Sequence, residues 1–251
     1  MENNKIIYYK QLDSTNTEIA RLAAEGAAHG TVVVADAQTA GKGRRGRGWE
    51  SPAGENIYMS MLLRPDCAPD KAPMLTLVMA YSVAKVLREV GFLDVQIKWP
   101  NDLVLSGKKI CGILTEMRLK DTEIEYVVVG VGINVNTSEF PKQIKGFATS
   151  LYLESGRVID RENMVESVVS YFDKAYEQFL ETMDLSFLRE AYNNMLVNVG
   201  KEVRVLEPEY EYTAYAQGIN SEGELVVRTV EGEEKRIYAG EVSVRGIYGY
   251  V

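Results

Sequence analysis

Apolar residues recur at helical spacing in two segments of the first hundred residues. Residues 14–28 place Ile19, Leu22 and Ala23 on one face, which predicts an amphipathic helix. Residues 73–90 carry a longer apolar stripe and are followed by glycine, a residue that commonly ends helices. The stripe consists of Leu75, Val78, Met79, Val83, Val86, Leu87 and Val90. This second helix is therefore predicted to be buried.

Short apolar runs bounded by turn residues predict the strands of a sheet. Two runs, residues 31–36 and 57–63, lie before the second helix. Four more follow it, separated by Pro, Asn, Asp and Gly residues: 95–98, 103–105, 110–117 and 126–135. Connections this short favour antiparallel pairing, because parallel strands need a long crossover. Helical patterns at 161–182 and 185–197 complete an α+β domain with a mixed or antiparallel sheet.

The pattern changes after Gly200. Residues 200–251 contain only short strand-like segments and turns: EVRVLE, YTAYAQGI, ELVVRT, EKRIYAG and EVSVRGI. Several short strands in succession are typical of a small β-barrel. A chain of 251 residues is long enough for one large domain and one small one. We therefore predict domains at residues 1–199 and 200–251.

Composition excludes several classes of protein. With 46% hydrophobic residues the chain can bury a core, so disorder of the whole chain is excluded. A net charge of -8 argues against bulk attraction to nucleic acid or an anionic membrane. Two cysteines and no apolar run of membrane-spanning length favour a cytoplasmic location. A single histidine argues against Ser/His/Asp or Cys/His catalysis.

A basic, glycine-rich loop stands out in this acidic chain. Residues 41–49, GKGRRGRGW, hold four cations and four glycines within nine positions. Glycines let the backbone approach a ligand closely, and arginine forks bind phosphate or carboxylate oxygens in pairs. The loop therefore indicates a site for a small polyanion, with a solvated basic loop or an RNA-contacting segment as the alternatives.

Two further clusters place charged side chains at the ends of predicted strands. In KWPND, residues 98–102, Asp102 could hold a hydrated divalent metal or orient a lysine, or could form an ordinary Asx turn. In GKKICGIL, residues 107–114, Lys109 either points into a pocket or is an exposed hairpin charge.

The last two clusters combine small and polar residues. GVGINVN, residues 130–136, puts glycines inside a strand, where the gaps admit a flat ligand or another backbone, or mark a bulge. DSTN, residues 13–16, could cap the first helix, bind a polar ligand near the helix end, or do both.

Taken in their order along the chain, from residue 13 to residue 136, the five clusters resemble those of the biotin protein ligase family, also called biotin–acetyl-CoA-carboxylase ligase. The resemblance implies a class II aminoacyl-tRNA-synthetase-like catalytic domain followed by an SH3-like barrel. It implies that biotin and MgATP form biotinoyl-5'-AMP, whose acyl group passes to a lysine. The implied acceptor is a biotin carboxyl carrier domain of acetyl-CoA or pyruvate carboxylase.

The resemblance also implies a role for each residue of the clusters. The implied biotin-binding residues are Ser14, Thr15, Asn16, Gln38, Gly41, Arg44, Arg45, Gly46, Lys109 and Gly112. The implied ATP-binding residues are Arg44, Arg45, Arg47, Trp49, Gly132 and Asn134. Arg44, Lys109 and Asp102 are the implied catalytic residues, and Asp102 is the candidate ligand, through water, of Mg²⁺.

Two departures and two rival interpretations accompany the resemblance. Lys42 stands where many relatives carry arginine, which replaces a bidentate fork by a point charge. Because twelve residues precede Asp13, we expect a monofunctional ligase that binds no DNA. A lipoate or octanoate ligase would share the fold, but its histidine-containing signature is missing; an RNA-binding module is the rival of another class. A homodimer and a monomer both remain open.

Overall fold

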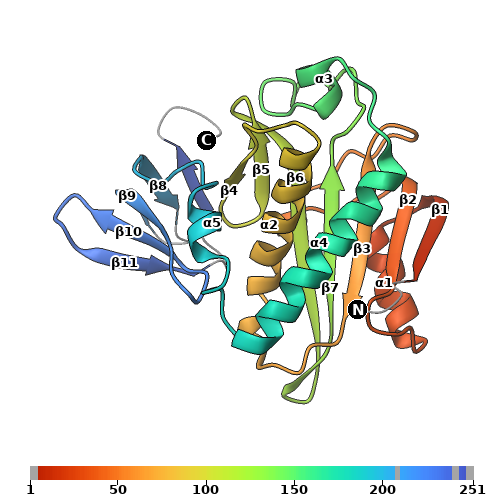
Figure 1. Ribbon diagram of the computed structural model, residues 1–251, viewed down its shortest axis with the longest axis horizontal. Helices are drawn as coiled ribbons and strands as arrows, with labels where there is room; N and C mark the ends of the chain where they lie inside the picture. The colour runs from red at the N-terminus through yellow and green to blue at the C-terminus, as the bar shows by residue number, and fades with distance from the viewer. Residues whose placement is uncertain (1–4, 207–209, 239–242, 247–251) are drawn as a thin grey trace.

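The computed structural model describes residues 5–206, 210–238 and 243–246, and its strands form two sheets. The larger sheet has seven strands in the order β1-β2-β3-β7-β6-β5-β4 (Figure 1). Their bounds are β1 Ile6–Leu12, β2 Val32–Gln38, β3 Ile57–Leu63, β4 Gln96–Lys98, β5 Asp102–Leu105, β6 Lys108–Lys120 and β7 Glu123–Ile133. Neighbouring strands are antiparallel except for β1 and β2, which confirms the predicted mixed, mostly antiparallel sheet.

Helices cover both faces of the larger sheet. α2 and α4 lie together on one face, and α1 lies on the other (Figure 1). The helices are α1 Thr15–Ala24, α2 Met74–Glu89, α3 Leu151–Ser155, α4 Arg161–Thr182 and α5 Arg189–Asn193, with short 3-10 turns η1 Arg44–Gly46 and η2 Pro69–Lys71. The α+β class is confirmed. None of the described helices is long and apolar enough to cross a membrane.

The alternation of side chains along β7 decides which face carries polar chemistry. Successive residues of a strand point to opposite faces. Val129 and Val131 belong to the large hydrophobic cluster beneath α2 and α4, whereas Val128 belongs to the smaller cluster beneath α1. Gly130 and Gly132 follow Val128 in this alternation, so they lie on the face that carries α1.

The structure corrects three details of the predicted elements. β1 occupies residues to which the pattern assigned no element, because this edge strand is half polar and its apolar alternation is weak. α1 ends at Ala24 rather than residue 28, and Gly26 follows with a positive φ of 92°. The helix predicted for 185–197 contracts to Arg189–Asn193, and turns precede and follow it.

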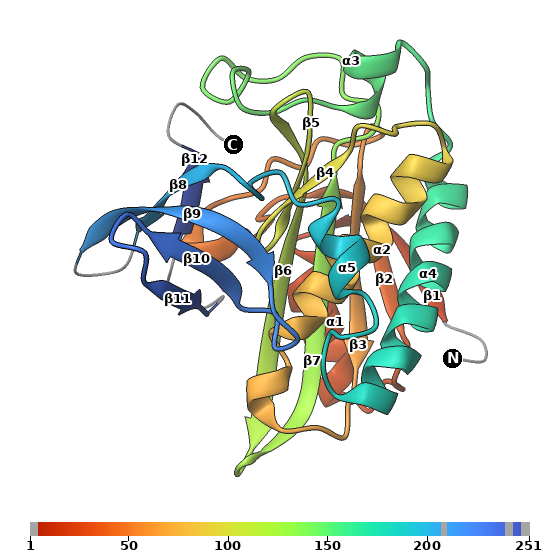
Figure 2. The same cartoon turned by 60° about the vertical axis from the view of Figure 1, so that its left-hand side comes forward.

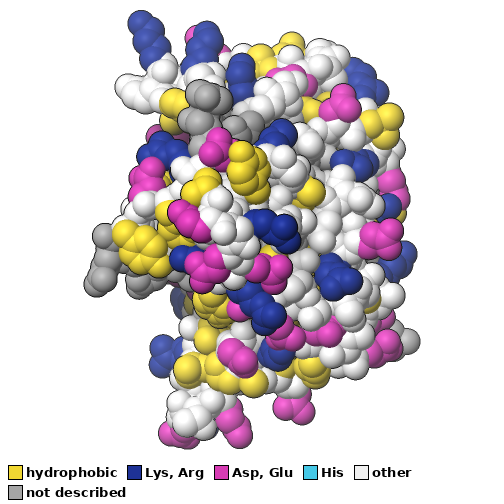
Figure 3. Space-filling model, turned by 90° about the vertical axis from the view of Figure 1, so that its left-hand side faces the viewer, with side chains coloured by type: hydrophobic (Ala, Val, Ile, Leu, Met, Phe, Trp, Pro, Cys, Tyr) yellow, Lys and Arg dark blue, Asp and Glu magenta, His cyan; other side chains and the backbone are white. Residues whose placement is uncertain are grey.

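The second sheet has five antiparallel strands in the order β11-β10-β9-β8-β12 and projects beside β4, β5 and β6 (Figure 2). Its strands are β8 Glu202–Leu206, β9 Glu211–Ile219, β10 Leu225–Thr229, β11 Glu234–Ile237 and β12 Ser243–Gly246. All five predicted strands are present; their residues 207, 239–242 and 247 lie outside the described part of the chain. On the face that carries this sheet, the acidic and basic side chains of the described residues intermingle and form no continuous basic surface (Figure 3).

The turn between β9 and β10 joins the two sheets. The indole Nε1 of Trp99 donates to the carbonyl oxygen of Gly223 at 3.0 Å, and Lys71 Nζ lies 2.6 Å from Glu222 Oε2. Apolar residues of both sheets also belong to one hydrophobic cluster. The division into domains 1–199 and 200–251 stays a prediction, because this core is continuous across it.

Replacing Trp99 with phenylalanine tests the bond between the sheets. The change keeps an aromatic ring in the core but leaves the Gly223 carbonyl without the indole donor. We expect a loss of about 1–2 kcal/mol in the free energy of unfolding, measured by urea denaturation. A loss below 0.3 kcal/mol would mean that water or another group replaces this hydrogen bond.

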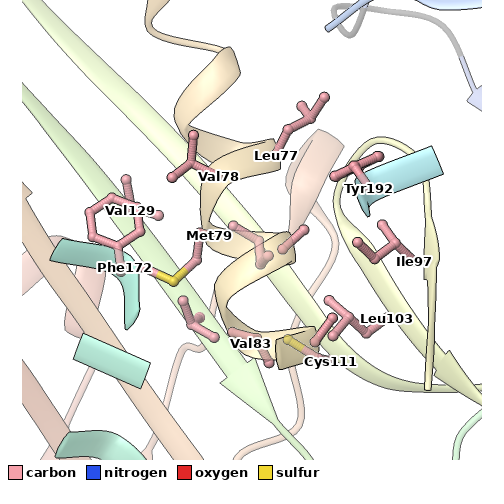
Figure 4. Packing of buried hydrophobic residues seen from close by; sticks show 14 of the residues in the cluster. Leu77, Val78, Met79, Val83, Ile97, Leu103, Cys111, Val129, Phe172 and Tyr192 are labelled. Atoms are coloured by element: carbon pink, nitrogen blue, oxygen red, sulfur yellow. The ribbon is translucent and has the colours of Figure 1, made fainter. Parts of the chain in front are cut away.

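The core beneath α2 is apolar throughout its centre. Met79 of α2 points toward Phe172 of α4, whereas Leu77 lies on the side of Tyr192 (Figure 4). Val78 and Val83 of α2 belong to the same hydrophobic cluster. Cys111 of β6 belongs to the same core, and its burial raises the pKa of its thiol. This cysteine is therefore a packing residue and not a nucleophile.

Candidate functional site

Three glycines of β6 and β7 form a floor without side chains, which we call the glycine floor: Gly112, Gly130 and Gly132. A Cβ at Gly132 would lie 2.5 Å from the indole of Trp49. A Cβ at Gly130 would lie 1.9 Å from Oδ1 of Asn16. The sequence indicated room here for a flat ligand or another backbone. In this structure two of the protein's own side chains, an indole and an amide, lie on the floor.

The basic loop, residues 41–49, folds back on itself beside the glycine floor. The amide of Gly43 donates to the carbonyl of Arg47 at 2.7 Å, and the amide of Trp49 donates to the carbonyl of Gly41 at 2.9 Å. A Cβ at Gly41 would lie 2.4 Å from the Trp49 carbonyl oxygen, so only glycine fits the base of the loop. These contacts place Trp49 over the floor.

Arg44 is the arginine of the basic loop that lines the cavity above the glycine floor. Its Nη1 donates to Oδ1 of Asn101 at 2.8 Å. Burial, and secondarily the neighbouring Arg45, lowers the pKa of the Arg44 guanidinium, although an arginine stays charged at neutral pH. Arg45 and Arg47 are exposed and do not line this cavity. Such partial burial of a cation strengthens its attraction for an anion.

Lys109 brings a second cation to the same cavity. Its Nζ lies 2.7 Å from Oδ1 of Asp102 and 5.2 Å from the centre of the Trp49 ring. Both partners of the ion pair are mostly buried, with side-chain exposures of 25% for Lys109 and 15% for Asp102. The ammonium therefore faces the pocket, and Asp102 holds it there.

Four residues, which we call the polar cluster, lie at the amino-terminal end of α1: Thr15, Asn16, Gln38 and Ser60. The amide and hydroxyl of Thr15 lie 2.8 and 3.2 Å from Oε1 of Gln38. The Ser60 hydroxyl lies 2.6 Å from Oδ1 of Asn16 and 2.8 Å from the Thr15 hydroxyl. Ser14 precedes the cluster and lines the same cavity. The cluster is a set of fixed donors and acceptors at one end of the glycine floor.

A second and larger cavity, of about 810 Å³, adjoins the first. Gln38, Trp49 and Lys109 line both cavities. Residues 134–149, which we call the β7–α3 loop, supply an apolar wall to the larger one through Phe140, Pro141, Ile144 and Phe147. Trp49 and Lys109 thus stand between a small polar chamber and a large, partly apolar one.

Polar side chains fasten the β7–α3 loop at both ends. Asn134 Nδ2 donates to the carbonyl of Thr149 at 3.1 Å. Asn56 Oδ1 accepts hydrogen bonds from the Val135 amide at 2.8 Å and from the Thr137 hydroxyl at 3.0 Å. Asn134 therefore shapes the loop through its side chain, and the middle of the loop forms the cavity wall.

Replacing Gly132 with alanine tests the packing of the Trp49 indole on the glycine floor. The added methyl would overlap the indole, so we expect the ring to leave the floor. In the Trp99→Phe background, where Trp49 is the remaining tryptophan, the emission should shift to longer wavelength as the indole becomes solvated. Gly146→Ala is the matched control, because a Cβ there meets nothing within 4 Å. An identical spectrum for Gly132→Ala would contradict this packing.

Comparison with known proteins places the chain in a family. Residues 8–134 match the biotin/lipoate A/B protein ligase family, and residues 199–245 match the biotin protein ligase C-terminal domain. A biotin–acetyl-CoA-carboxylase ligase of Paracoccus denitrificans is 31% identical over 93% of this chain and 98% of its own. The chain belongs to the biotin protein ligase family.

Other members of the biotin protein ligase family share both the sequence and the fold. The bifunctional ligase/repressor BirA of Bacillus subtilis is 37% identical over 95% of this chain and 74% of its own length. The biotin protein ligase of Aquifex aeolicus in complex with biotin and ATP is 34% identical. It superimposes with a TM-score of 0.84 over 97% of this chain and 100% of that one. Biotin protein ligase activity, and the fold expected for it, follow for this chain.

Most of the residues that the family resemblance implies lie at the two cavities. The structure gathers these residues, implied by the resemblance, around them: Ser14, Thr15, Asn16, Gln38, Arg44, Trp49, Lys109, Gly112, Gly132 and Asn134. Gly41 supports the loop, and Asp102 supports Lys109. Arg45, Gly46 and Arg47 lie on the exposed side of the loop, outside both cavities.

Sequence reasoning missed three supports of the candidate site. Ser60 is a lone polar residue in the apolar strand sequence IYMSMLL, and that contrast is a signal that could have found it. Asn101 was quoted within KWPND but given no contact with Arg44. The apolar wall of the β7–α3 loop carried no recognisable motif, because its position depends on the fold.

Proposed function

We propose that the two cavities together join the carboxylate of biotin to the α-phosphate of ATP, and that the smaller one holds the ureido ring. The polar cluster offers hydrogen-bonding groups to the ring, and the larger cavity, with its apolar wall, suits an adenine base. The observation that carries this proposal is that Lys109 lines both cavities, while Arg44 brings a second cation to the smaller one.

Charge accounts for the roles of these two cations. A carboxylate and a triphosphate repel each other, so the reaction needs fixed positive charge where they meet. Lys109 lies at that junction and would stabilise the carboxylate and then the mixed-anhydride oxygen. Arg44 would hold the phosphate of the adenylate. Catalysis then depends on positioning and charge, and no side chain needs to act as a covalent nucleophile.

Trp49 must change place when ligands bind. The smaller cavity measures about 50 Å³ with the indole on the glycine floor, far below the ~300 Å³ at the lower end of ligand pockets. The buried indole Nε1 has no hydrogen-bond partner among the described residues, so leaving the floor breaks none of these bonds. We propose that the indole moves onto the adenine ring and that the basic loop then excludes water from the adenylate.

Mg²⁺ would enter with the nucleotide. No three acidic, histidine or cysteine side chains of the described residues converge on a point where they could hold a metal ion. Asp102, the candidate ligand, has the Lys109 ammonium 2.7 Å away. The residues present therefore fit a metal that is held mainly by ATP phosphates, with Asp102 contributing at most through water.

The acceptor is proposed to be a lysine of a biotin carboxyl carrier domain, of acetyl-CoA carboxylase or of pyruvate carboxylase. The name of the Paracoccus denitrificans relative includes the first of these enzymes. Asp102 is positioned to orient the incoming amine beside Lys109. A cytoplasmic location suits such a partner and the two free thiols, Cys67 and Cys111.

A homodimer is proposed from the free edge of β6. This strand runs to Lys120, but its pairing with β5 covers only Lys108 to Gly112. The outer half keeps one edge unpaired by β5 and carries two exposed apolar side chains, Met117 and Leu119. Sedimentation velocity with and without biotin and ATP distinguishes a dimer from a monomer.

Biotin-dependent exchange of pyrophosphate into ATP tests the proposed function. We expect exchange with biotin and none with lipoate, followed by biotin transfer to a purified carrier domain. Exchange that depended on lipoate would favour the rival ligase. Nucleic-acid binding without exchange would favour the RNA-binding interpretation of the basic loop.

A further inference from the structure

Glu116 lines neither of the two cavities, yet its carboxylate contacts the polar cluster. It lies on the exposed outer half of β6, on the same face as Leu114 and the glycine floor. Its Oε2 accepts a hydrogen bond of 2.6 Å from Nδ2 of Asn16. The same Nδ2 lies 3.4 Å from the Leu114 carbonyl oxygen. Both acceptors on β6 therefore face the amino group of one buried amide.

This contact decides which way the Asn16 amide points. An ionised carboxylate only accepts hydrogen bonds, so Glu116 requires the NH₂ end of Asn16 on its side. The carbonyl Oδ1 must then face Ser60, whose hydroxyl lies 2.6 Å away. Asn16 is buried, at 5% exposure, and its amide occupies the space that the absence of a side chain at Gly130 leaves.

The orientation passes through Ser60 to Thr15. A serine hydroxyl has a single proton, and Oδ1 of Asn16 has none, so Ser60 donates to Asn16. The Thr15 hydroxyl lies 2.8 Å from the Ser60 hydroxyl and 3.2 Å from Gln38 Oε1, so it donates its own proton to one of these two oxygens. The lone pairs of Thr15 remain available to a ligand, and they suit a ligand that donates N–H groups.

We infer that Glu116 is a positioning residue for biotin binding, which acts through Asn16 and Ser60 to keep the Thr15 hydroxyl as an acceptor for a ureido N–H. This inference rests on the proposed function of the smaller cavity. Glu116 touches neither ligand. Its effect is therefore confined to biotin and leaves the nucleotide cavity unchanged.

Binding measurements on Glu116→Ala test the inference. We expect the dissociation constant for biotin, measured by calorimetry, to rise about tenfold, because the buried amide loses its charged acceptor. The KM for ATP and kcat at saturating biotin should stay within about twofold of wild type. Glu116→Gln should show a smaller rise, because its amide oxygen can still accept. Glu125→Ala is the matched control, since Glu125 is a glutamate of the neighbouring strand paired with exposed Arg118 at 3.1 Å.

A double-mutant cycle with Ser60→Ala separates orientation from general weakening. If Glu116 acts through Ser60, the double variant should bind biotin about as well as Ser60→Ala alone. Independent, multiplying losses would overturn the inference, as would an unchanged biotin affinity in Glu116→Ala or an equal loss of ATP affinity. A wild-type chain that bound no biotin would instead contradict the proposed function. Melting temperatures of all variants, compared with Glu125→Ala, identify losses caused by unfolding.

Discussion

Replacing Lys109 with alanine is expected to lower kcat/KM for biotin adenylation by about 10³-fold. Its ammonium is fixed by Asp102 at 2.7 Å and lines both cavities, so that in the proposed function it lies where the carboxylate and the phosphate would meet. A preorganised cation in a partly buried site contributes more than one in water, because little solvent screens it. Pyrophosphate exchange at saturating and limiting biotin measures the loss.

Two variants separate this catalytic role from a structural one. Lys109→Ala leaves Asp102 without its ammonium partner, and that change alone could lower the melting temperature. Adding Asp102→Asn removes the charge, so the double variant should regain stability without regaining adenylation. Lys108→Ala, the adjacent lysine that lines neither cavity, should adenylate normally. Full adenylation activity in the folded Lys109→Ala variant would contradict the proposed role of Lys109 in the reaction.

Elements that bury one continuous apolar surface could be predicted closely from the sequence. β3 occupies residues 57–63 as predicted, and all of its positions are buried. α4 occupies residues 161–182 as predicted, because its stripe faces α2 and Asp160 caps its first turn. β1 could not be predicted in this way, since an edge strand with exposed positions alternates weakly. The parallel pairing of β1 with β2 depends on α1 crossing between them.

The residues of the candidate site also differ in how well the sequence predicts them. Residues whose chemistry is visible in short motifs, such as Arg44, Lys109 and Thr15, could be named from the sequence. Residues that act through distant contacts could not. Glu116 lies 100 positions from Asn16 in the sequence, and only the pairing of β6 with β7 beneath α1 brings them together. The contact of Arg44 with Asn101 likewise spans 57 positions.

Replacing Arg44 with alanine is expected to raise the rate at which the adenylate leaves the enzyme by about 10²-fold. Arg44 is the arginine of the basic loop that faces the cavity, and Asn101 holds its guanidinium at 2.8 Å. Without it, the phosphate loses a charged partner and the loop loses the contact that would draw it over the intermediate. Released adenylate acylates any nearby lysine, so labelling should spread to proteins other than the carrier.

The measurement is a single-turnover experiment with radioactive biotin. Adenylate formed on the enzyme is chased with unlabelled biotin and ATP, and the label retained on the protein is followed in time. Asn101→Ala should give an intermediate rate, because Arg44 then keeps its charge but loses its position. Arg118→Ala, an exposed arginine paired with Glu125, is the matched control. If the Arg44→Ala variant retained the adenylate as long as the wild-type enzyme does, the loop would protect the adenylate without this guanidinium. Closure of the loop would then depend on other residues.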